Sequence, residues 1–170
     1  IFVLGCNGNL GKSITDYLAN TLNTSVYGVD LHPKYRGEND RVEYHSYDFI
    51  KVGFNKELKE ILNKSDSSNC FINLIAKDYP VANNYSDINL SKNSPFELVL
   101  DEVCESFKIT LGSSYILIQE VMKFNKKNNH IILVGSIYSR NLPNPLNYSD
   151  KGDVYKPVAY SLSKSAQNML

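Results

Sequence analysis

A tyrosine and a lysine near the end of the chain have the types and the spacing for proton transfer. Tyr160 and Lys164 lie four residues apart, which places the phenol and the ammonium on one face of a helix. A free tyrosine has a pKa near ~10, and a neighbouring cation favours its phenolate. A tyrosine activated in this way can exchange a proton with an alcohol or carbonyl oxygen. Ser136, at the end of the preceding predicted strand, could hydrogen-bond the same oxygen.

The stretch LGCNGNLGKS near the start of the chain contains the glycines of a phosphate-binding turn. An ATP-type loop requires G-x-x-x-x-G-K-[ST], and its first glycine would then stand where the chain has Cys6. Gly5, Gly8 and Gly11 instead form G-x-x-G-x-x-G, a variant of the dinucleotide fingerprint. Helical periodicity follows Gly11, so a phosphate would face a helix N-terminus. The pattern favours a dinucleotide, and a nicotinamide would supply the hydride that accompanies the tyrosine's proton.

Two aspartates end predicted strands on the same side as the glycine turn. Asp30 comes 19 residues after the last of these glycines, where a carboxylate can accept hydrogen bonds from the adenosine ribose. The same charge would repel a 2′-phosphate, so NAD is favoured over NADP. The basic residues His32, Lys34 and Arg36 follow closely and could soften that preference. Asp48, at the end of the third predicted strand, is placed to contact adenine.

Strand and helix signals alternate along the chain. Strands are predicted over 1–4, 25–31, 42–49, 70–76 and 130–136. Helices are predicted over about 12–22, 54–63 and 96–125, with a last helix from about 158 and loops over 77–95 and 137–157. This alternation predicts an α/β fold, a Rossmann-type doubly wound parallel sheet with helices on both faces. We expect a single domain over 1–170. Because the chain starts inside a strand and stops inside a helix, we expect a fold truncated at both ends.

Composition and charge exclude several classes of function. The chain has 170 residues, 18 basic and 18 acidic side chains, and 42% hydrophobic content, which fits one soluble domain with a substantial core. A formal net charge of zero gives no reason to expect nucleic-acid or membrane binding. No apolar run approaches the roughly 18 residues of a membrane span. Cys6, Cys70 and Cys104 lack metal-ligand spacing, so we expect no metal and reduced thiols in the cytoplasm.

The motifs of this chain, taken in the order in which they occur, resemble those of the short-chain dehydrogenases and reductases. They are Gly5, Gly8 and Gly11, Asp30, Asp48, the stretch INLIA at 72–76, Gly135-Ser136, and Tyr160 with Lys164. The resemblance covers nearly all of the chain. It implies transfer of a hydride between NAD(P) and a carbonyl or alcohol, with Ser136, Tyr160 and Lys164 as catalytic serine, acid/base tyrosine and its lysine. It also implies a homodimer or homotetramer, paired through the helix over 96–125 and the Tyr160 helix.

The resemblance further implies which residues contact the cofactor. They are Gly5, Asn7, Gly8, Asn9, Leu10, Gly11, Asp30, Asp48, Phe49, Leu74, Ile75 and Ala76, with Tyr160 and Lys164 beside the nicotinamide ribose. More narrowly, the stretches KDYPVANNY, GSIYSRNLPN and KPVAYSLSKS are similar to those of bacterial oxidoreductases of surface-glycan and flagellin-sugar (nonulosonic acid) biosynthesis.

The chain departs from the family pattern in three places. The family's Asn-Asn-Ala-Gly is replaced by Asn73-Leu74-Ile75-Ala76, so ribose contacts there would come mostly from the backbone. Thr110 stands where the family has its proton-relay asparagine, and it could hold a water but cannot copy an amide. Ser136 and Tyr160 are 24 residues apart, roughly ten more than usual. The extra loop carries tyrosines and charges that suit a polar substrate such as a sugar.

Two alternative functions fit the same fold. A sugar-nucleotide epimerase or dehydratase would keep NAD bound and regenerate it, and the spacing of Gly5, Gly8 and Gly11 is more usual in that branch. A catalytically silent dinucleotide-binding sensor would keep the glycine turn, but such proteins commonly lose the serine, tyrosine and lysine that this chain has.

Overall fold

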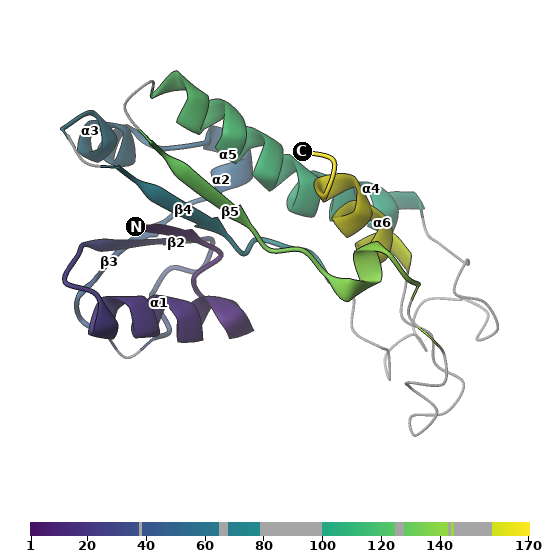
Figure 1. Cartoon of the computed structure of the whole chain (residues 1–170), viewed down its shortest axis with the longest axis horizontal. Coiled ribbons are helices and arrows are strands. Elements are labelled where there is room, and N and C mark those ends of the chain that lie inside the picture. The colour runs from purple at the N-terminus through teal and green to yellow at the C-terminus, as the bar shows by residue number, and fades with distance from the viewer. Residues whose placement is uncertain (38, 65–67, 79–99, 125–127, 143, 145–157) are drawn as a thin grey trace. The chain divides into compact units, whose positions relative to one another are not determined.

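The computed structural model describes residues 1–37, 39–64, 68–78, 100–124, 128–142, 144 and 158–170 (Figure 1). The chain forms two compact units, which are described separately. The first consists of residues 1–75 and 113–134, and the second of residues 76–112 and 135–170. The single domain over 1–170 stays a prediction. Most of the predicted loops over 77–95 and 137–157 lies outside the described residues.

The first unit is built on a five-stranded parallel sheet. Its strands are β1 (Phe2–Leu4), β2 (Val26–Asp30), β3 (Val42–Ser46), β4 (Cys70–Asn73) and β5 (His130–Leu133). Their order in space is β3-β2-β1-β4-β5, and every neighbouring pair is parallel. All three residues of β1 are buried, as expected for a central strand that is covered on both faces. The strand order reverses between β1 and β4, where sheets of this class bind ligands beyond the carboxyl ends of their strands.

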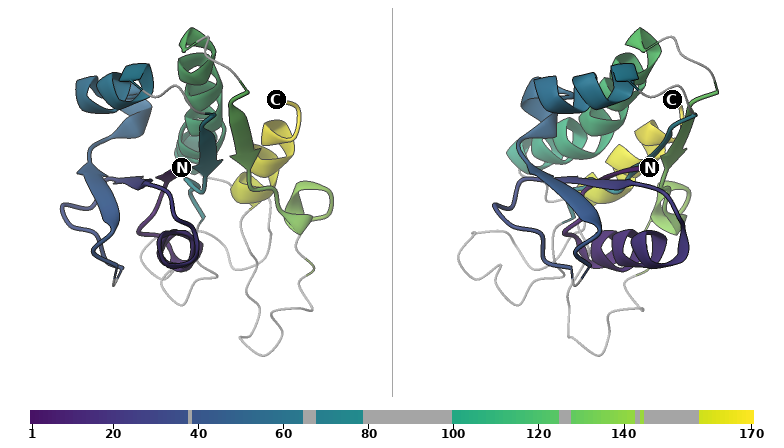
Figure 2. Two further views of the ribbon diagram at one scale, coloured as in Figure 1. Left: turned by 60° about the vertical axis from the view of Figure 1, so that its left-hand side comes forward. Right: turned by 90° about the vertical axis from the view of Figure 1, so that its left-hand side faces the viewer.

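Helices cover both faces of this sheet (Figures 1 and 2). On one face lies α1 (Asn9–Thr21), and on the other lie α2 (Phe49–Val52), α3 (Lys56–Lys64) and α5 (Gly112–Lys123). The larger core, on the α5 side, contains the stacked rings of Phe2 and Phe71 with Phe54 beside them. The prediction of a doubly wound α/β fold with a parallel sheet is confirmed.

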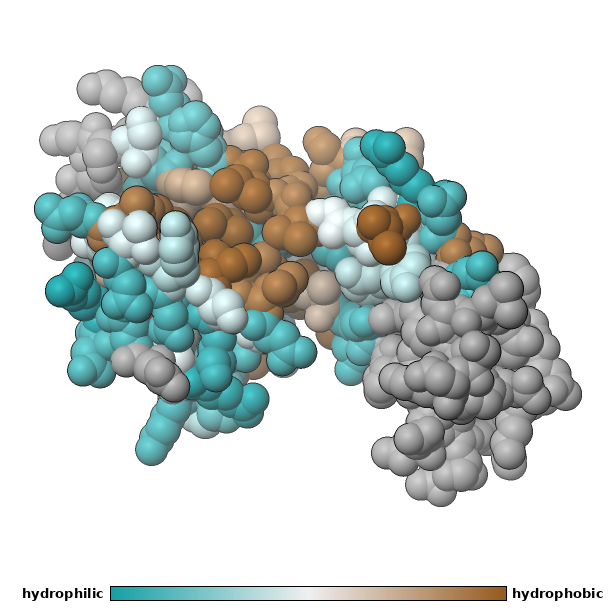
Figure 3. Space-filling view, turned by 60° about the horizontal axis from the view of Figure 1, so that its bottom comes forward, coloured by the Kyte–Doolittle hydropathy of each residue, from teal (hydrophilic) through white to brown (hydrophobic). Residues whose placement is uncertain are grey.

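The smaller core lies on the α1 side, and Figure 3 shows a face on which apolar side chains are exposed. Ala19 of α1 packs there with Val3 and Ile72. Ile132 of β5 lies beside Ile72 in the sheet register and is 46% exposed. Because α1 lies against β1, β2 and β3, the exposed apolar area is found toward β5.

Several predicted boundaries are wrong, and local hydrogen bonds give the reason for the ends of β3 and β4. β3 ends at Ser46 instead of 49, because the side chain of Asp48 accepts hydrogen bonds from the N–H groups of Ile50 and Lys51, at 3.1 and 3.3 Å, and starts α2. β4 ends at Asn73 instead of 76, since the side-chain oxygen of Asn73 accepts from the N–H of Ile75 at 3.0 Å and turns the chain. β5 ends at 133 instead of 136, and α1 begins at 9 instead of 12.

Among its described residues, the second unit contains helices and no strand. It contains α4 (Leu100–Ser106), the π-helical turn η1 (Phe107–Leu111), the 3₁₀ turn η2 (Ile137–Ser139) and α6 (Val158–Gln167). The helix predicted over 96–125 therefore contains a π turn, a feature that is frequent at functional sites. α6 packs against α4, η1 and η2. Small side chains allow this approach: Ser106 and Ser163 are fully buried, with their hydroxyl oxygens 3.0 Å apart.

No helix in the described part of the chain has the length and apolar character needed to cross a membrane.

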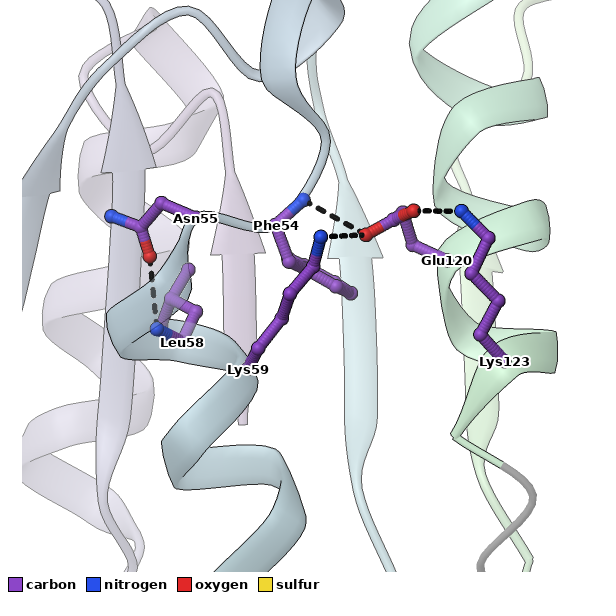
Figure 4. Close-up of polar contacts among 6 residues, drawn as sticks. All are labelled: Phe54, Asn55, Leu58, Lys59, Glu120 and Lys123. Atoms are coloured by element: carbon purple, nitrogen blue, oxygen red, sulfur yellow. Dashed lines mark hydrogen bonds and ion pairs between the residues drawn. The ribbon is translucent and has the colours of Figure 1, made fainter.

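A buried carboxylate ties α5 to the segment between α2 and α3 (Figure 4). The side chain of Glu120 is 7% exposed and accepts a hydrogen bond from the backbone N–H of Phe54 at 3.2 Å. It also pairs with Lys59 at 3.2 Å and with Lys123. Gly53 passes this side chain with φ +62, and a Cβ there would lie 2.9 Å from the Glu120 carboxyl carbon. Burial alone would raise the pKa of Glu120, but the hydrogen bonds from Lys123, Lys59 and Phe54 outweigh it and lower the pKa.

We predict that Glu120→Gln lowers the free energy of unfolding by about 1–3 kcal/mol at pH 7, because a buried charge-assisted network loses its charge. The pKa of Glu120 is lower in the folded state than its ordinary value of 4.5. Its contribution is therefore present above that value and is lost as the pH falls through the folded-state pKa. Urea unfolding at pH 7 and at progressively lower pH measures the difference in unfolding free energy between the variant and the wild type. This difference should shrink as the pH falls.

Glu60→Gln is the matched control. Glu60 is 54% exposed and pairs with Lys56 at 4.0 Å, so its loss should change stability by less than about 0.5 kcal/mol. Equal destabilisation by the two substitutions would contradict the role given to Glu120.

Candidate active site

The glycine turn after β1 has the backbone geometry that its glycines require. Gly5 has φ +78, and a Cβ there would lie 2.9 Å from the backbone nitrogen of Ile75. A Cβ on Gly11 would lie 2.1 Å from the carbonyl oxygen of Gly5, so helix α1 can approach the turn only with glycine at this position. Gly8 is the N-cap of α1 and has an ordinary φ of −66. The turn thus leads directly into a helix N-terminus with backbone N–H groups available for a phosphate.

Three other predicted contact residues lie in this turn or at the start of α1. Asn9 and Leu10 are the first two residues of α1, and both are exposed. The side chain of Asn7 is engaged elsewhere: its nitrogen donates to the carbonyl of Lys34 and to the hydroxyl of Tyr44, both at 3.1 Å, and its oxygen accepts from the N–H of Arg36 at 2.7 Å. Asn7 therefore holds the segment after β2 against the glycine turn.

Asp30 ends β2 beside the glycine turn. One of its carboxylate oxygens accepts a hydrogen bond from the N–H of Asn7 at 3.0 Å, and the other accepts from the N–H of His32 at 3.2 Å. Each carboxylate oxygen can accept more than one hydrogen bond, so these bonds orient Asp30 and leave acceptor capacity for a ribose hydroxyl. The charge predicted to repel a 2′-phosphate is held in place by the backbone of the turn itself.

The pair Asp48 and Phe49 differs from the prediction. Asp48 lies at the start of α2 and not at the end of a strand, and its side chain caps that helix. The ring of Phe49 is 2% exposed, lies in the core and has its centroid 5.4 Å from that of Phe54. Of Phe49 only the backbone could therefore contact a cofactor.

The turn after β4 is shaped by a buried asparagine that sequence reasoning did not single out. Asn73 is fully buried and donates to the hydroxyls of Ser113 and Ser114, both at 3.0 Å. With the N–H of Ile75 bound to its oxygen, it directs the backbone of Leu74 and Ile75 past Gly5. A polar residue inside the apolar run CFINLIA was the available signal. Ala76, the last predicted contact of this turn, belongs to the second unit and is exposed.

The second unit carries the predicted catalytic pair on α6. Lys164 is 3% exposed, and its nitrogen lies 6.0 Å from the centroid of the Tyr160 ring. The ammonium donates a hydrogen bond to the side-chain oxygen of Gln167 at 2.9 Å. Burial lowers the pKa of Lys164 to about 8. Gln167 was not among the predicted residues, although its place one turn after Lys164 on the same face was visible in the sequence.

Ser136 is three residues beyond the end of β5 and not its last residue. It is extended, with φ −151 and ψ 148, and caps η2: its hydroxyl oxygen accepts from the N–H of Tyr138 at 3.2 Å. Its carbonyl accepts from the hydroxyl of Ser139 at 2.6 Å, and Ser139 in turn accepts from Asn168, just after α6, at 2.8 Å. The position of Ser136 is thus tied to the helix of Tyr160.

Thr110 lies in the π turn η1 and is fully buried. Its hydroxyl oxygen accepts a hydrogen bond from the backbone N–H of Lys77 at 3.0 Å, so it anchors the chain that leaves the sheet after β4. Ser136, Tyr160, Lys164 and Thr110 all belong to the second unit, and α6 packs against the turns that carry or follow the other two residues. The glycine turn, Asp30 and Asp48 belong to the first unit.

Comparison with solved structures places this fold among known ones. No protein-family model and no curated protein matches the chain. A short-chain dehydrogenase from Leptospira borgpetersenii with bound NAD⁺ is similar, with a TM-score of 0.66 and 20% identity over 97% of this chain and 59% of that one. One from Burkholderia cenocepacia in complex with NADP has a TM-score of 0.68 and 15% identity over 99% and 61%.

A third similar structure, a short-chain dehydrogenase family protein from Francisella tularensis, has a TM-score of 0.63 and 16% identity over 97% of this chain and 57% of that one. The fold is that of the short-chain dehydrogenases. The chain spans 57–61% of the lengths of these three proteins.

Proposed function

We propose that this chain belongs to an NAD(P)-dependent oxidoreductase of the short-chain dehydrogenase/reductase type. The glycine turn carries the proposal, because the positive φ of Gly5 and the contact that excludes a Cβ at Gly11 are what a dinucleotide-binding turn requires. The Tyr160 and Lys164 pair on α6 supports it with a proton donor beside a buried cation. The dinucleotide bound in the similar Leptospira and Burkholderia structures agrees with it.

In this proposal the residues divide the work between binding and proton transfer. A nicotinamide dinucleotide, when bound, supplies or accepts the hydride. The N–H groups at the start of α1 bind its phosphates, and Asp30 binds the adenosine ribose. Tyr160 donates a proton to the oxygen that becomes an alcohol, or removes it in the reverse direction. Ser136 hydrogen-bonds the same oxygen, and the Lys164 ammonium favours the tyrosinate and binds the nicotinamide ribose.

We expect this protein to bind NADH at least tenfold more tightly than NADPH. A carboxylate and a phosphate about 4 Å apart repel by ~1 kcal/mol in water and by several times that in a partly desolvated site. Titration of the full-length protein with both reduced cofactors, followed by their fluorescence, measures the preference. Asp30→Asn should reduce it, whereas Asp40→Asn, the same change at an exposed position, should leave it unchanged. Equal or tighter NADPH binding by the wild type would show that Asp30 does not select the cofactor.

The substrate in this proposal is a small polar molecule, and a sugar or sugar nucleotide is the class we favour. The loop that supports this choice carries Tyr148, Asp150, Lys151 and Tyr155 and lies outside the described residues. The narrower similarity to enzymes of surface-glycan and nonulosonic acid biosynthesis points the same way. A screen of sugar nucleotides and other polar carbonyl compounds against NADH absorbance tests it.

An epimerase or dehydratase that retains its NAD is the second candidate, favoured by the equal spacing of Gly5, Gly8 and Gly11. Tightly bound NAD that copurifies, with no net turnover of added NADH, would identify that reaction. A silent sensor would bind NAD, but NAD would not copurify with it and it would not turn over added NADH. We also propose a homodimer or homotetramer of the full-length protein in the cytoplasm, where Cys6, Cys70 and Cys104, all free thiols here, would stay reduced.

A further inference from the structure

Gln167 provides a hydrogen-bond acceptor to a buried charge. The side chains of Lys164 and Gln167 are each 3% exposed, and their polar ends meet at 2.9 Å. A buried ammonium is stable only where acceptors replace the water that it has lost. An amide oxygen is a suitable replacement because it accepts a charge-assisted hydrogen bond and adds no negative charge.

The position of Gln167 relative to the proposed catalytic pair is set by the helix. Tyr160, Lys164 and Gln167 follow one another at intervals of four and three residues, which brings all three to one face of α6. One of the three ammonium hydrogens is directed to Gln167. This bond restricts the rotation of a long flexible side chain and so determines where the other two hydrogens can point.

We propose that Gln167 is a positioning residue for Lys164, whose side-chain oxygen orients the buried ammonium and keeps it protonated. The importance of Lys164 for catalysis rests on the proposed function, and this inference adds the residue that controls it. A neutral Lys164 would no longer favour the tyrosinate of Tyr160. Gln167 would thus act on proton transfer through Lys164 without contacting the substrate.

The titratable groups around Lys164 on the neighbouring elements are the same in the wild type and in the Gln167 variants. Burial is the cause of the lowered pKa of Lys164. Within the described part of the chain, the titratable groups on the elements packed against α6, and on the segments beside them, are Lys77, Asp78, Asp101, Glu102, Cys104, Glu105, Lys108, Tyr138 and Arg140. Lys77 pairs with Glu105 at 3.6 Å. A change at Gln167 leaves all of these in place, so a difference in the titration of Lys164 reports on Gln167.

The experiment follows Lys164 directly in the cofactor-free protein. The full-length protein is labelled with ¹³C at the lysine ε-carbon, and the Lys164 resonance is assigned by its loss in Lys164→Arg. In the wild type it should titrate near pH 8. Gln167→Met, which retains the volume and removes the acceptor, should lower this pKa by a unit or more, because a charge-assisted hydrogen bond is lost. Gln167→Glu should raise it by a similar amount, because a carboxylate favours the ammonium.

Gln119→Met is the matched control, the same substitution at an exposed helical position, and should leave the titration unchanged. In the active full-length enzyme, the pH at which kcat is lost on the alkaline side should fall in Gln167→Met and rise in Gln167→Glu. If the pKa of Lys164 were the same in the wild type and in both Gln167 variants, the inference would be overturned. The NMR titration needs no cofactor or substrate, so it tests the role of Gln167 even if the protein transfers no hydride. Absence of hydride transfer would overturn the proposed function and not the inference about Gln167.

Discussion

Replacing Tyr160 by phenylalanine is expected to lower turnover by ~10²–10⁴-fold or more while changing NAD affinity little. Hydride transfer to a carbonyl leaves an alkoxide that needs a proton, and the phenol on α6 is the donor in the proposed mechanism. Phenylalanine retains nearly all of the packing of this partly buried ring, so the loss should appear in kcat. Steady-state kinetics of the full-length enzyme, with NADH binding measured separately, distinguishes the two quantities.

Three further variants sharpen this experiment. Tyr115→Phe makes the same change at a tyrosine that is 52% exposed on α5, and it should keep full activity. Lys164→Ala should reduce both turnover and NAD binding, because the ammonium is expected to serve both. Ser136→Ala should mainly lower turnover. Full activity of Tyr160→Phe on an identified substrate would refute the catalytic assignment and favour a silent sensor or another site.

Gly11→Ala is expected to abolish dinucleotide binding and to destabilise the fold by about 3 kcal/mol or more, the upper range for overpacking. The added Cβ would lie 2.1 Å from the carbonyl oxygen of Gly5 and 2.8 Å from the carbonyl carbon of Cys6. Both are backbone atoms, so the overlap can be relieved only by moving the turn or α1. Urea unfolding measures the stability, and NADH fluorescence measures the binding.

Gly8→Ala tests whether the effect is specific to the contact and not to glycine as such. A Cβ at Gly8 would meet the carbonyl oxygen of Gly5 at 3.4 Å, and the φ of Gly8 is ordinary. The loss of unfolding free energy should therefore stay within about 1 kcal/mol, the value for a weaker helix N-cap. If Gly11→Ala and Gly8→Ala had equally small effects, the tight approach of α1 to the turn would not be essential.

The sequence by itself determined the class of the fold and the position of the glycine turn after the first strand. Buried parallel strands need apolar residues on both faces, so they are recognised as short apolar runs between helical stretches. The glycines are equally readable, because Gly5 and Gly11 stand where any side chain would meet backbone atoms. The spacing of Tyr160 and Lys164 likewise implied a shared helix face, and α6 carries both. These properties depend on periodicity and on residues a few positions apart.

The ends of the strands and the partners of the polar side chains were decided only by the tertiary structure. Asp48 caps a short helix and Phe49 enters the core because the chain turns after β3, which an alternating stretch does not reveal. Asn73 finds its serine partners 40 and 41 residues away, and Thr110 meets Lys77 across 33 residues. A buried polar group must be satisfied by whichever partner the packing brings within reach. For that reason the sequence pattern predicts the fold correctly. The individual hydrogen bonds of the candidate site are known only once the helices and strands are packed together.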